Sequence, residues 1–175
     1  QGINLPHVMH YTDVLERCCP VEFPAVIIGG GGVACDVAKY LAKNRSLIQE
    51  HAHRYLEQHS VGFKMDRYIE ADRSIDLLTE PAITLLQRSS RKIAFRVGRT
   101  TRWILMQALK KADVAIQNQV DVMEITPDAV IVHNRGNKRT ETLPAQAVII
   151  AAGQIQQVGL GAILEQRGIP YSIIG

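Results

Sequence analysis

The sequence predicts an α/β domain with a central parallel sheet, helices packed on it and a three-stranded antiparallel meander. Three short apolar segments, 25–28, 83–87 and 147–151, have the composition of strands that are buried on both faces. Apolar residues at helical spacing follow the first two segments, as in the strand–helix–strand units of a parallel sheet. Shorter strands between turn residues at 120–143 predict the meander.

The composition is that of one globular domain. The chain has 175 residues, of which 46% are hydrophobic and 21% are charged. The longest apolar segment, 145–153, is too short to span a bilayer. We expect no secretion, because this sequence does not open on a basic stretch followed by an apolar one. The cysteines Cys18, Cys19 and Cys35 have no zinc-type or disulfide-framework spacing. We therefore expect a cytoplasmic protein with no membrane partner and no metal site.

We divide the chain into a lead-in segment, residues 1–22, and one domain, residues 23–175. In the lead-in, residues 7–11 are predicted to be irregular, and Thr12 to cap a short helix that runs to Arg17. Residues 44–81 are polar, show no sustained period and predict an excursion with one or two weak helices. The histidines His51, His53 and His59 fall there and are interpreted as surface residues, because no ligand partner has suitable spacing.

The remaining elements follow from short apolar runs and helical spacing. A helix over 101–111 is predicted to bury Ile104, Leu105, Ala108 and Leu109. A short helix is expected at 163–167. The further strands are expected at 114–116, 120–125, 129–133, 139–143 and 170–174.

A glycine turn stands between the first strand and the first long helix. Gly29 and Gly31 with Ala34 match the dinucleotide-binding pattern of a Rossmann-like fold. In that pattern the first glycine makes the turn, the second lets the backbone approach a pyrophosphate, and the small third residue lets helix and strand pack. Gly32 and Val33 complete the predicted contact, and Gly153, after the last buried strand, joins the predicted site. The alternative is a turn that only packs closely.

The second strand is followed by basic residues where an acid would be expected for NAD. An acidic residue there binds the ribose hydroxyl of NAD, whereas basic residues accommodate the 2′-phosphate of NADP. Arg88, Ser89 and Lys92 therefore predict an NADP(H) site, with a solvated basic loop as the alternative. Residues 81–112 hold eight of the 20 basic residues and no acidic one. A second phosphate contact, or simple helix capping, is predicted at Arg99, Thr100 and Thr101.

Four segments occur in an order that resembles a known family: 26–34 (VIIGGGGVA), 85–88 (LLQR), 98–101 (GRTT) and 148–154 (VIIAAGQ). They look like the NADPH-binding domain of bacterial 2,4-dienoyl-CoA reductase, a relative of trimethylamine dehydrogenase among the old yellow enzyme-like flavoproteins. Residues 6–15 also resemble the segment that enters that domain. The resemblance covers most of the chain and is weakest over 44–81, which lacks a tryptophan-containing segment expected there.

The resemblance implies a domain excised from a larger oxidoreductase. In that family NADPH passes a hydride to FAD, and electrons then reach FMN and an unsaturated acyl-CoA through a 4Fe–4S cluster. The expected partners are thus NADPH and the parent chain's FAD domain and FMN barrel, with no flavin, cluster or catalytic residue in this chain. By the same resemblance, Arg88 and Lys92 take the 2′-phosphate of NADPH.

Three other functions remain as alternatives. A structural ADP-binding module, as in the trimethylamine dehydrogenase branch, would not need the basic loop, because ADP has no 2′-phosphate. An S-adenosylmethionine methyltransferase would place an acid after the second strand, where Arg88 stands. A nucleic-acid binder would use stacking aromatics, and the basic segment contains only Phe95 and Trp103. We therefore expect no nucleic-acid partner.

Overall fold

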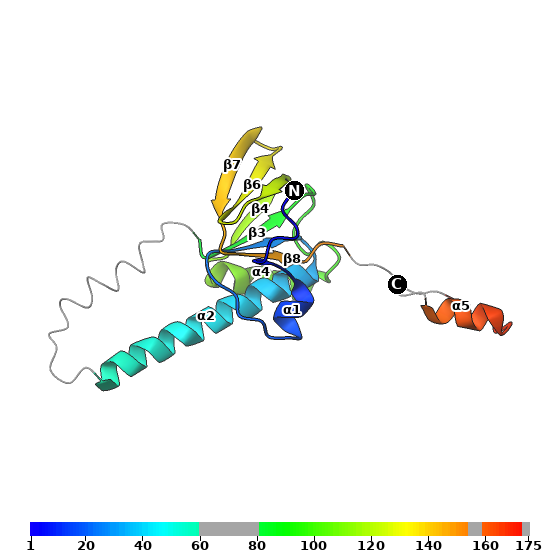
Figure 1. The fold of residues 1–175 in the computed structure, drawn as a ribbon, viewed down its shortest axis with the longest axis horizontal. Helices are drawn as coiled ribbons and strands as arrows, with labels where there is room; N and C mark the ends of the chain where they lie inside the picture. Colours follow the sequence, from blue (N-terminus) through cyan, green and yellow to red (C-terminus); the bar gives the residue numbers. More distant parts are fainter. Residues whose placement is uncertain (60–80, 154–158, 173–175) are drawn as a thin grey trace.

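A computed structural model describes residues 1–59, 81–153 and 159–172, and the first two of these ranges build a parallel sheet with the elements that pack on it (Figure 1). The sheet has five strands, and helices cover one of its faces. A separate three-stranded antiparallel sheet packs on the other face. This arrangement confirms the predicted fold class, including the meander.

The parallel sheet has the strand order β1-β8-β2-β3-β4. All of its strand pairs are parallel. Their carboxyl ends therefore lie along one edge, the edge at which open α/β sheets bind ligands. The strands are β1 (Val8–His10), β2 (Ala25–Ile28), β3 (Ile83–Gln87), β4 (Ala115–Asn118) and β8 (Ala147–Ile150).

Burial on both faces explains why the central strands are apolar throughout. In β2, Ala25 and Ile27 pack in the core shared with the helices. The alternate residues Val26 and Ile28 pack in the core shared with the antiparallel sheet. Strand β8 divides its residues between the same two cores, so the sheet separates two apolar layers.

Two helices cover the middle of the sheet, α2 (Gly32–His59) and α4 (Arg99–Lys111). As predicted, Leu105 and Leu109 of α4 are buried. The prediction that Ile104 is buried is wrong, because its side chain is 57% exposed. One residue rotates a helix by about 100°, so Ile104 lies beside the buried face that Leu105 and Leu109 define. The helix also begins at Arg99, two residues before the predicted start.

The meander strands agree closely with the prediction: β5 (Val120–Ile125), β6 (Ala129–Asn134) and β7 (Arg139–Pro144). They pair antiparallel in the order β5-β6-β7. Fully or nearly fully buried side chains join this sheet to the parallel one, namely Val120, Ile125, Val130, Val132, Val26, Leu86 and Val148.

The lead-in differs from the prediction. Residues 8–10 are not irregular but form β1, which pairs with β8 through Val8 and Val148. Helix α1 (Tyr11–Leu15) begins one residue before Thr12 and ends before Arg17. The residue just ahead of the helix is His10, not Thr12, and its N–H donates to the carboxylate of Asp13, the third residue of the helix, at 2.8 Å. Val14 is fully buried, so the lead-in packs into the domain core.

Three further boundaries were predicted incorrectly. Residues 44–59 continue α2 as one helix, whereas residues 60–80 of the predicted excursion lie outside the described residues. Helix α5 (Gly159–Gln166) begins four residues before the predicted start. The final strand predicted at 170–174 is wrong for its described part, since 170–172 are not a strand.

Candidate functional site

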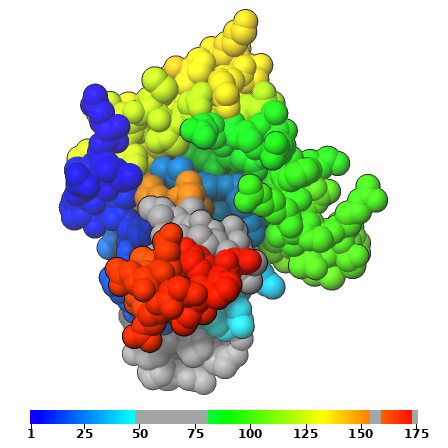
Figure 2. Space-filling model, turned by 90° about the vertical axis from the view of Figure 1, so that its right-hand side faces the viewer, coloured from blue at the N-terminus to red at the C-terminus, as the bar shows by residue number. Residues whose placement is uncertain are grey.

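The carboxyl edge of the parallel sheet brings together most of the predicted site residues. The glycine turn joins the end of β2 to the start of α2, and a loop of residues 88–98, called the basic loop below, joins β3 to α4. Figure 2 looks onto this edge, where the ends of β2 and β8 lie centrally beside the green segment that contains the basic loop. Two helices thus begin at the edge, and helix N-termini favour anions.

The protein itself requires glycine at the first two positions of the turn. Gly29 has a φ of +151°, and a Cβ built there would lie 2.7 Å from the carbonyl carbon of Ala151. A Cβ on Gly30 would lie 2.6 Å from the Cγ and Cδ atoms of Gln87. Neither distance is compatible with a side chain. These two glycines are therefore explained by packing against β8 and against the Gln87 side chain.

Gly31 is different, because no contact with the described residues requires it to be glycine. No described atom lies within 4 Å of a Cβ built on Gly31, and its φ is outside the left-handed region. It is also exposed at the edge, one residue before α2. The space beside Gly31 is open, as a close approach by a phosphate group would need.

Gln87 connects the end of β3 to the basic loop. Its side-chain Nε2 donates to the Oγ of Ser89 at 2.7 Å and to the backbone oxygens of Ser89 and Arg91. Gln87 is only 6% exposed, whereas the residues that accept these hydrogen bonds are exposed. Its Oε1 is buried and has no hydrogen-bond partner among the described residues.

The basic loop is also attached to the glycine turn. The Ala94 N–H donates to the carbonyl oxygen of Gly30 at 2.8 Å. Ala94 is 1% exposed and has a φ of +53°, a conformation that alanine rarely adopts without support from its surroundings. Further along the loop, a Cγ of Val97 lies 3.3 Å from the position of a Cβ on Gly32. Loop and turn therefore form one packed unit.

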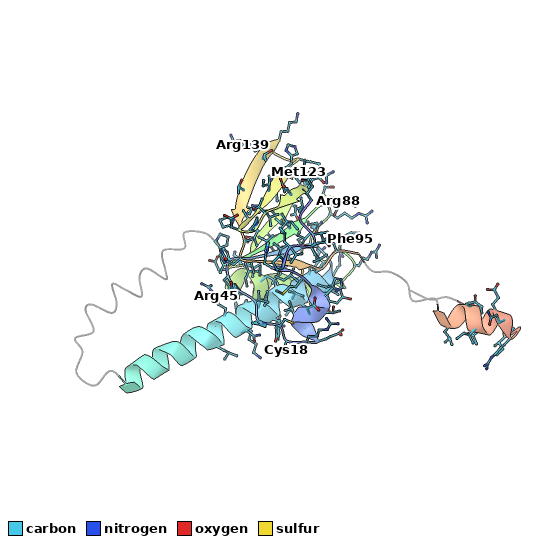
Figure 3. The ribbon with its side chains drawn as sticks, viewed as in Figure 1. Cys18, Arg45, Arg88, Phe95, Met123 and Arg139 are labelled. Atoms are coloured by element: carbon cyan, nitrogen blue, oxygen red, sulfur yellow. The ribbon has the colours of Figure 1, made fainter. Side chains whose placement is uncertain are left out.

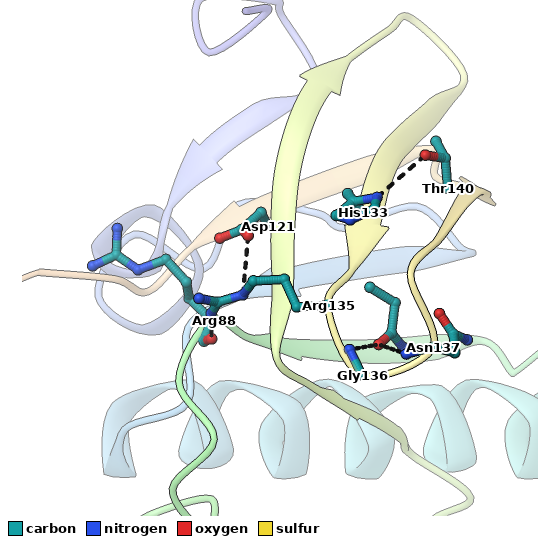
Figure 4. Close-up of polar contacts among 8 residues, drawn as sticks. Arg88, Asp121, His133, Arg135, Gly136, Asn137 and Thr140 are labelled. Atoms are coloured by element: carbon teal, nitrogen blue, oxygen red, sulfur yellow. Dashed lines mark hydrogen bonds and ion pairs between the residues drawn. The ribbon is translucent and has the colours of Figure 1, made fainter.

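A residue of the meander holds the beginning of the basic loop. Arg135, in the turn between β6 and β7, donates from Nη2 to the backbone oxygen of Arg88. Its Nε also pairs with the Asp121 carboxylate at 3.0 Å. Figure 4 shows the Arg88 guanidinium directed away from this pair. The Arg88 side chain is thus exposed while its backbone is held.

The predicted site residues take several positions. Gly29, Gly31, Gly32 and Val33 lie in the turn and at the start of α2, whereas Ala34 is fully buried in the helix core and serves packing. Gly153 follows β8, whose carboxyl end packs on Gly29. The exposed predicted residues are Arg88, Ser89, Lys92, Arg99, Thr100 and Thr101, of which the last three form the first turn of α4.

Gln87 and Arg135 belong to the site but were not predicted from the sequence. Gln87 could have been identified, because a buried amide that ends an apolar strand must find hydrogen-bond partners nearby. Arg135 had no such signal, since its contact with Arg88 joins turns that are 47 residues apart.

The positive charge of the basic loop is concentrated on one side of the molecule. Its basic residues are exposed, and Arg91 lies over the Phe95 ring at 5.3 Å from the ring centroid. Figure 3 places Arg88 and Phe95 on the side of the sheet's carboxyl edge, whereas Arg139 extends from the far end of the meander. A phosphate at the edge would meet several cations and no carboxylate from residues 81–112.

Cys35, just behind the turn, is not a reactive thiol. It is fully buried in the first turn of α2. Burial, with a smaller contribution from the Asp36 charge, raises the pKa of Cys35 to about 11. The thiol is therefore protonated at neutral pH, and Cys35 packs as a small buried residue.

Other kinds of site find no support in the part of the chain that the structure describes. In residues 1–59, 81–153 and 159–172, with the side chains of 48–59 left aside, no group of three or more His, Cys, Asp or Glu residues is placed to hold a metal ion. Within the same ranges, no helix combines the length and the apolar character needed to cross a membrane.

Comparison with known proteins gives one family and several related structures. A family model described as pyridine nucleotide-disulphide oxidoreductase matches residues 6–172. A metal reductase of Desulforamulus reducens is 30% identical over 171 residues, which are 96% of this chain and 24% of that protein. The chain thus spans about a quarter of the length of this curated relative.

Two solved structures share the fold. A 2-naphthoyl-CoA reductase in complex with 2-naphthoyl-CoA superposes with a TM-score of 0.67 and 19% identity, covering 97% of this chain and 20% of that one. The 6-hydroxypseudooxynicotine amine oxidase of Pseudomonas geniculata gives a TM-score of 0.61 and 19% identity, covering 95% and 20%. The family match and these likenesses together show a Rossmann-like FAD/NAD(P)-binding fold.

Proposed function

Because the chain belongs to the pyridine nucleotide-disulphide oxidoreductase family, a flavin- and NAD(P)-binding redox family, we propose that it is the NADPH-binding part of a larger flavoprotein. In this proposal the pyrophosphate lies against Gly31 and the start of α2, and the 2′-phosphate lies at the basic loop. Arg88 and Lys92 supply the charges, and Ser89 supplies a hydroxyl.

The open space at Gly31 carries the proposal. A glycine that neither its φ nor its neighbours require is explained by a ligand that approaches the backbone there. The basic loop supports NADP over NAD, because Arg88, Arg91 and Lys92 follow β3 and no carboxylate does. The same basic loop favours NADPH over a structural ADP, which lacks the 2′-phosphate.

Bound NADPH would supply a hydride, and the residues of this chain would bind and orient the nucleotide that carries it. We propose that the hydride passes to an FAD held elsewhere in the whole protein, as in 2,4-dienoyl-CoA reductase. An FMN barrel and a 4Fe–4S cluster, implied by the same resemblance, would also lie outside this chain. The names of the relatives give different substrates, a metal and naphthoyl-CoA, so the proposal covers the nucleotide-binding part alone.

Calorimetric titration of the chain with NADPH and NADH tests this function. We expect the wild type to bind NADPH more tightly than NADH. Arg88→Ala should weaken the binding of NADPH about 10- to 100-fold and change the affinity for NADH little. This range follows from the roughly 1.5–3 kcal/mol that a hydrogen bond to a charged group contributes. Arg139→Ala is the matched control, since it removes an exposed arginine from the far end of the meander. Equal affinity of the wild type for both nucleotides would contradict the proposal.

A further inference from the structure

Gln87 occupies an unusual position for an uncharged polar residue. It ends β3, in which all five residues are buried, and its side chain lies between the glycine turn and the basic loop. On the turn side, its Cγ and Cδ fill the space that a side chain on Gly30 would need. On the loop side, its amide group reaches Ser89 and Arg91.

The orientation of the amide follows from its surroundings. Two of the atoms that face Nε2 are backbone carbonyl oxygens, which can only accept hydrogen bonds. A reversed amide would place its own oxygen against both of them. The nitrogen therefore faces the loop, and the oxygen lies against Gly30, where no described residue donates to it.

These bonds determine the shape of the segment that offers its charges to a phosphate. Residues 88–92 bend around the Gln87 amide, because Nε2 bonds to the oxygens of both Ser89 and Arg91. The Arg91 N–H in turn donates to Ser89 Oγ at 3.3 Å. Arg88, Ser89 and Lys92 are exposed, and the Ser89 Oγ faces the Gln87 amide, from which it accepts a hydrogen bond.

We propose that Gln87 is a positioning residue that holds residues 88–92 in the form that receives the 2′-phosphate, and that it thereby determines the preference for NADPH over NADH. The inference rests on the proposed function, in which this segment binds that phosphate. Gln87 touches the loop rather than the nucleotide, and its effect is exerted through the placement of Arg88, Ser89 and Lys92.

Two substitutions separate the hydrogen bonds from the volume of the side chain. Gln87→Met keeps the length of the side chain and removes the donor, whereas Gln87→Glu places a carboxylate against two carbonyl oxygens. We expect both variants to lower the ratio of NADPH to NADH affinity about tenfold, almost entirely through weaker NADPH binding. Gln146→Glu is the matched control, because it makes the same chemical change at an exposed position before β8, at the opposite edge of the sheet.

Two further measurements test positioning directly. Without nucleotide, both Gln87 variants should be cleaved faster by trypsin after Arg88, Arg91 and Lys92, because the bend is released. On lowering the pH from about 8 to about 5.5, Gln87→Glu should regain part of its preference relative to the wild type. Burial raises the pKa of a carboxyl, and its protonated form has one O–H donor for the loop. Gln87→Met should show no such recovery.

The outcomes distinguish this inference from the proposed function. A wild type without preference for NADPH would overturn both. If the wild type prefers NADPH and the Gln87 variants keep the same ratio of NADPH to NADH affinity, only the role of Gln87 is overturned. If the Gln87 variants bind both nucleotides equally more weakly and also melt at a lower temperature, Gln87 has only a structural role, and the inference is overturned as well. If Gln87→Glu does not fold, the uncharged Gln87→Met variant decides the question by the same ratio.

Discussion

Substitutions along the glycine turn should separate ligand binding from folding. Gly31→Ala adds a methyl group where no described atom lies within 4 Å, at a φ that alanine can adopt. Replacing glycine at a compatible position removes freedom from the unfolded chain and stabilises by about 0.4–1 kcal/mol. For a domain of about this size, 1 kcal/mol corresponds to about 2–4 °C. We therefore expect the nucleotide-free melting temperature to stay constant or to rise by about 1–4 °C.

The same methyl group should prevent NADPH from binding. If the pyrophosphate approaches the backbone at Gly31, the methyl group occupies its space and removes hydrogen bonds to a charged group, which contribute about 1.5–3 kcal/mol each. NADPH affinity should then fall by at least about 10- to 100-fold for Gly31→Ala, and further for the larger Gly31→Val. NADH should be affected equally, because both nucleotides contain the pyrophosphate.

Gly30→Ala is the matched control. Its methyl group would lie 2.6 Å from Gln87 Cδ, so the Gln87 side chain must move or the turn must shift. Overpacking of this kind costs about 1–3 kcal/mol, which corresponds to a loss of about 2–12 °C in melting temperature. Thermal melts with and without NADPH measure both effects. A Gly31→Ala chain that melts well below the wild type, or that keeps its full NADPH-induced shift, would refute this explanation of Gly31.

Three further predictions concern other parts of the molecule. Arg135→Lys keeps the positive charge but loses the guanidinium group that reaches both the Asp121 carboxylate and the Arg88 backbone oxygen. The affinity for NADPH, measured by titration, should therefore fall as much as in Arg135→Ala. An Arg135→Lys variant with wild-type affinity would show that the charge alone matters. The raised pKa of Cys35 stabilises the fold fully below pH 9.0, and this contribution of about 2–3 kcal/mol is lost as the pH rises through about 11. The melting temperature of Cys35→Ala should therefore fall less than that of the wild type as the pH rises from 9.0 to about 11. Cys18→Ala, which removes an exposed thiol, should behave like the wild type. The purified chain should carry no visible flavin absorbance, because its glycine turn is assigned to NADPH; a stoichiometric yellow chromophore would contradict this assignment.

The sheet and the glycine turn could be predicted from the sequence because both depend on local patterns. Strands such as β2 and β8 are apolar on both faces. The turn is a run of four glycines between a strand and a segment whose apolar residues have helical spacing. The meander was equally accessible, since turn residues separate its strands. In each case the pattern lies within about ten residues of the element that it predicts.

Other elements were misjudged. Strand β1 has three residues, and its apolar alternation is too short to distinguish from an irregular segment. The second half of α2 is mostly polar, but its apolar residues at 47, 48, 52, 55 and 56 are at helical spacing, so this half of the helix could have been predicted. Helix α5 and the segment after it pack on each other, with Tyr171 about 3.1 Å from the position of a Cβ on Gly161. An apolar run there resembles a strand, but no strand of the described sheet pairs with residues 170–172.

The candidate site shows the same division between local and tertiary information. The sequence contains the charges of the basic loop, but three contacts determine where they lie, and two of these join residues that are far apart in the sequence. Arg135 holds the start of the loop from the meander side of the sheet, Gln87 shapes residues 88–92 from within, and Ala94 binds the oxygen of Gly30.

The anchoring of the loop has a consequence for specificity. Mobile surface cations attract any anion, and salt screens this attraction beyond about 8–10 Å. NADPH and NADH both carry the pyrophosphate, so such an attraction would raise both affinities and distinguish them weakly. A cation whose backbone is held, as that of Arg88 is held by Arg135, has fewer positions to lose on binding. Recognition of the 2′-phosphate should therefore depend on the residues that fix the loop as much as on the charges of the loop. The preference for NADPH over NADH should persist at a salt concentration that weakens the binding of both nucleotides.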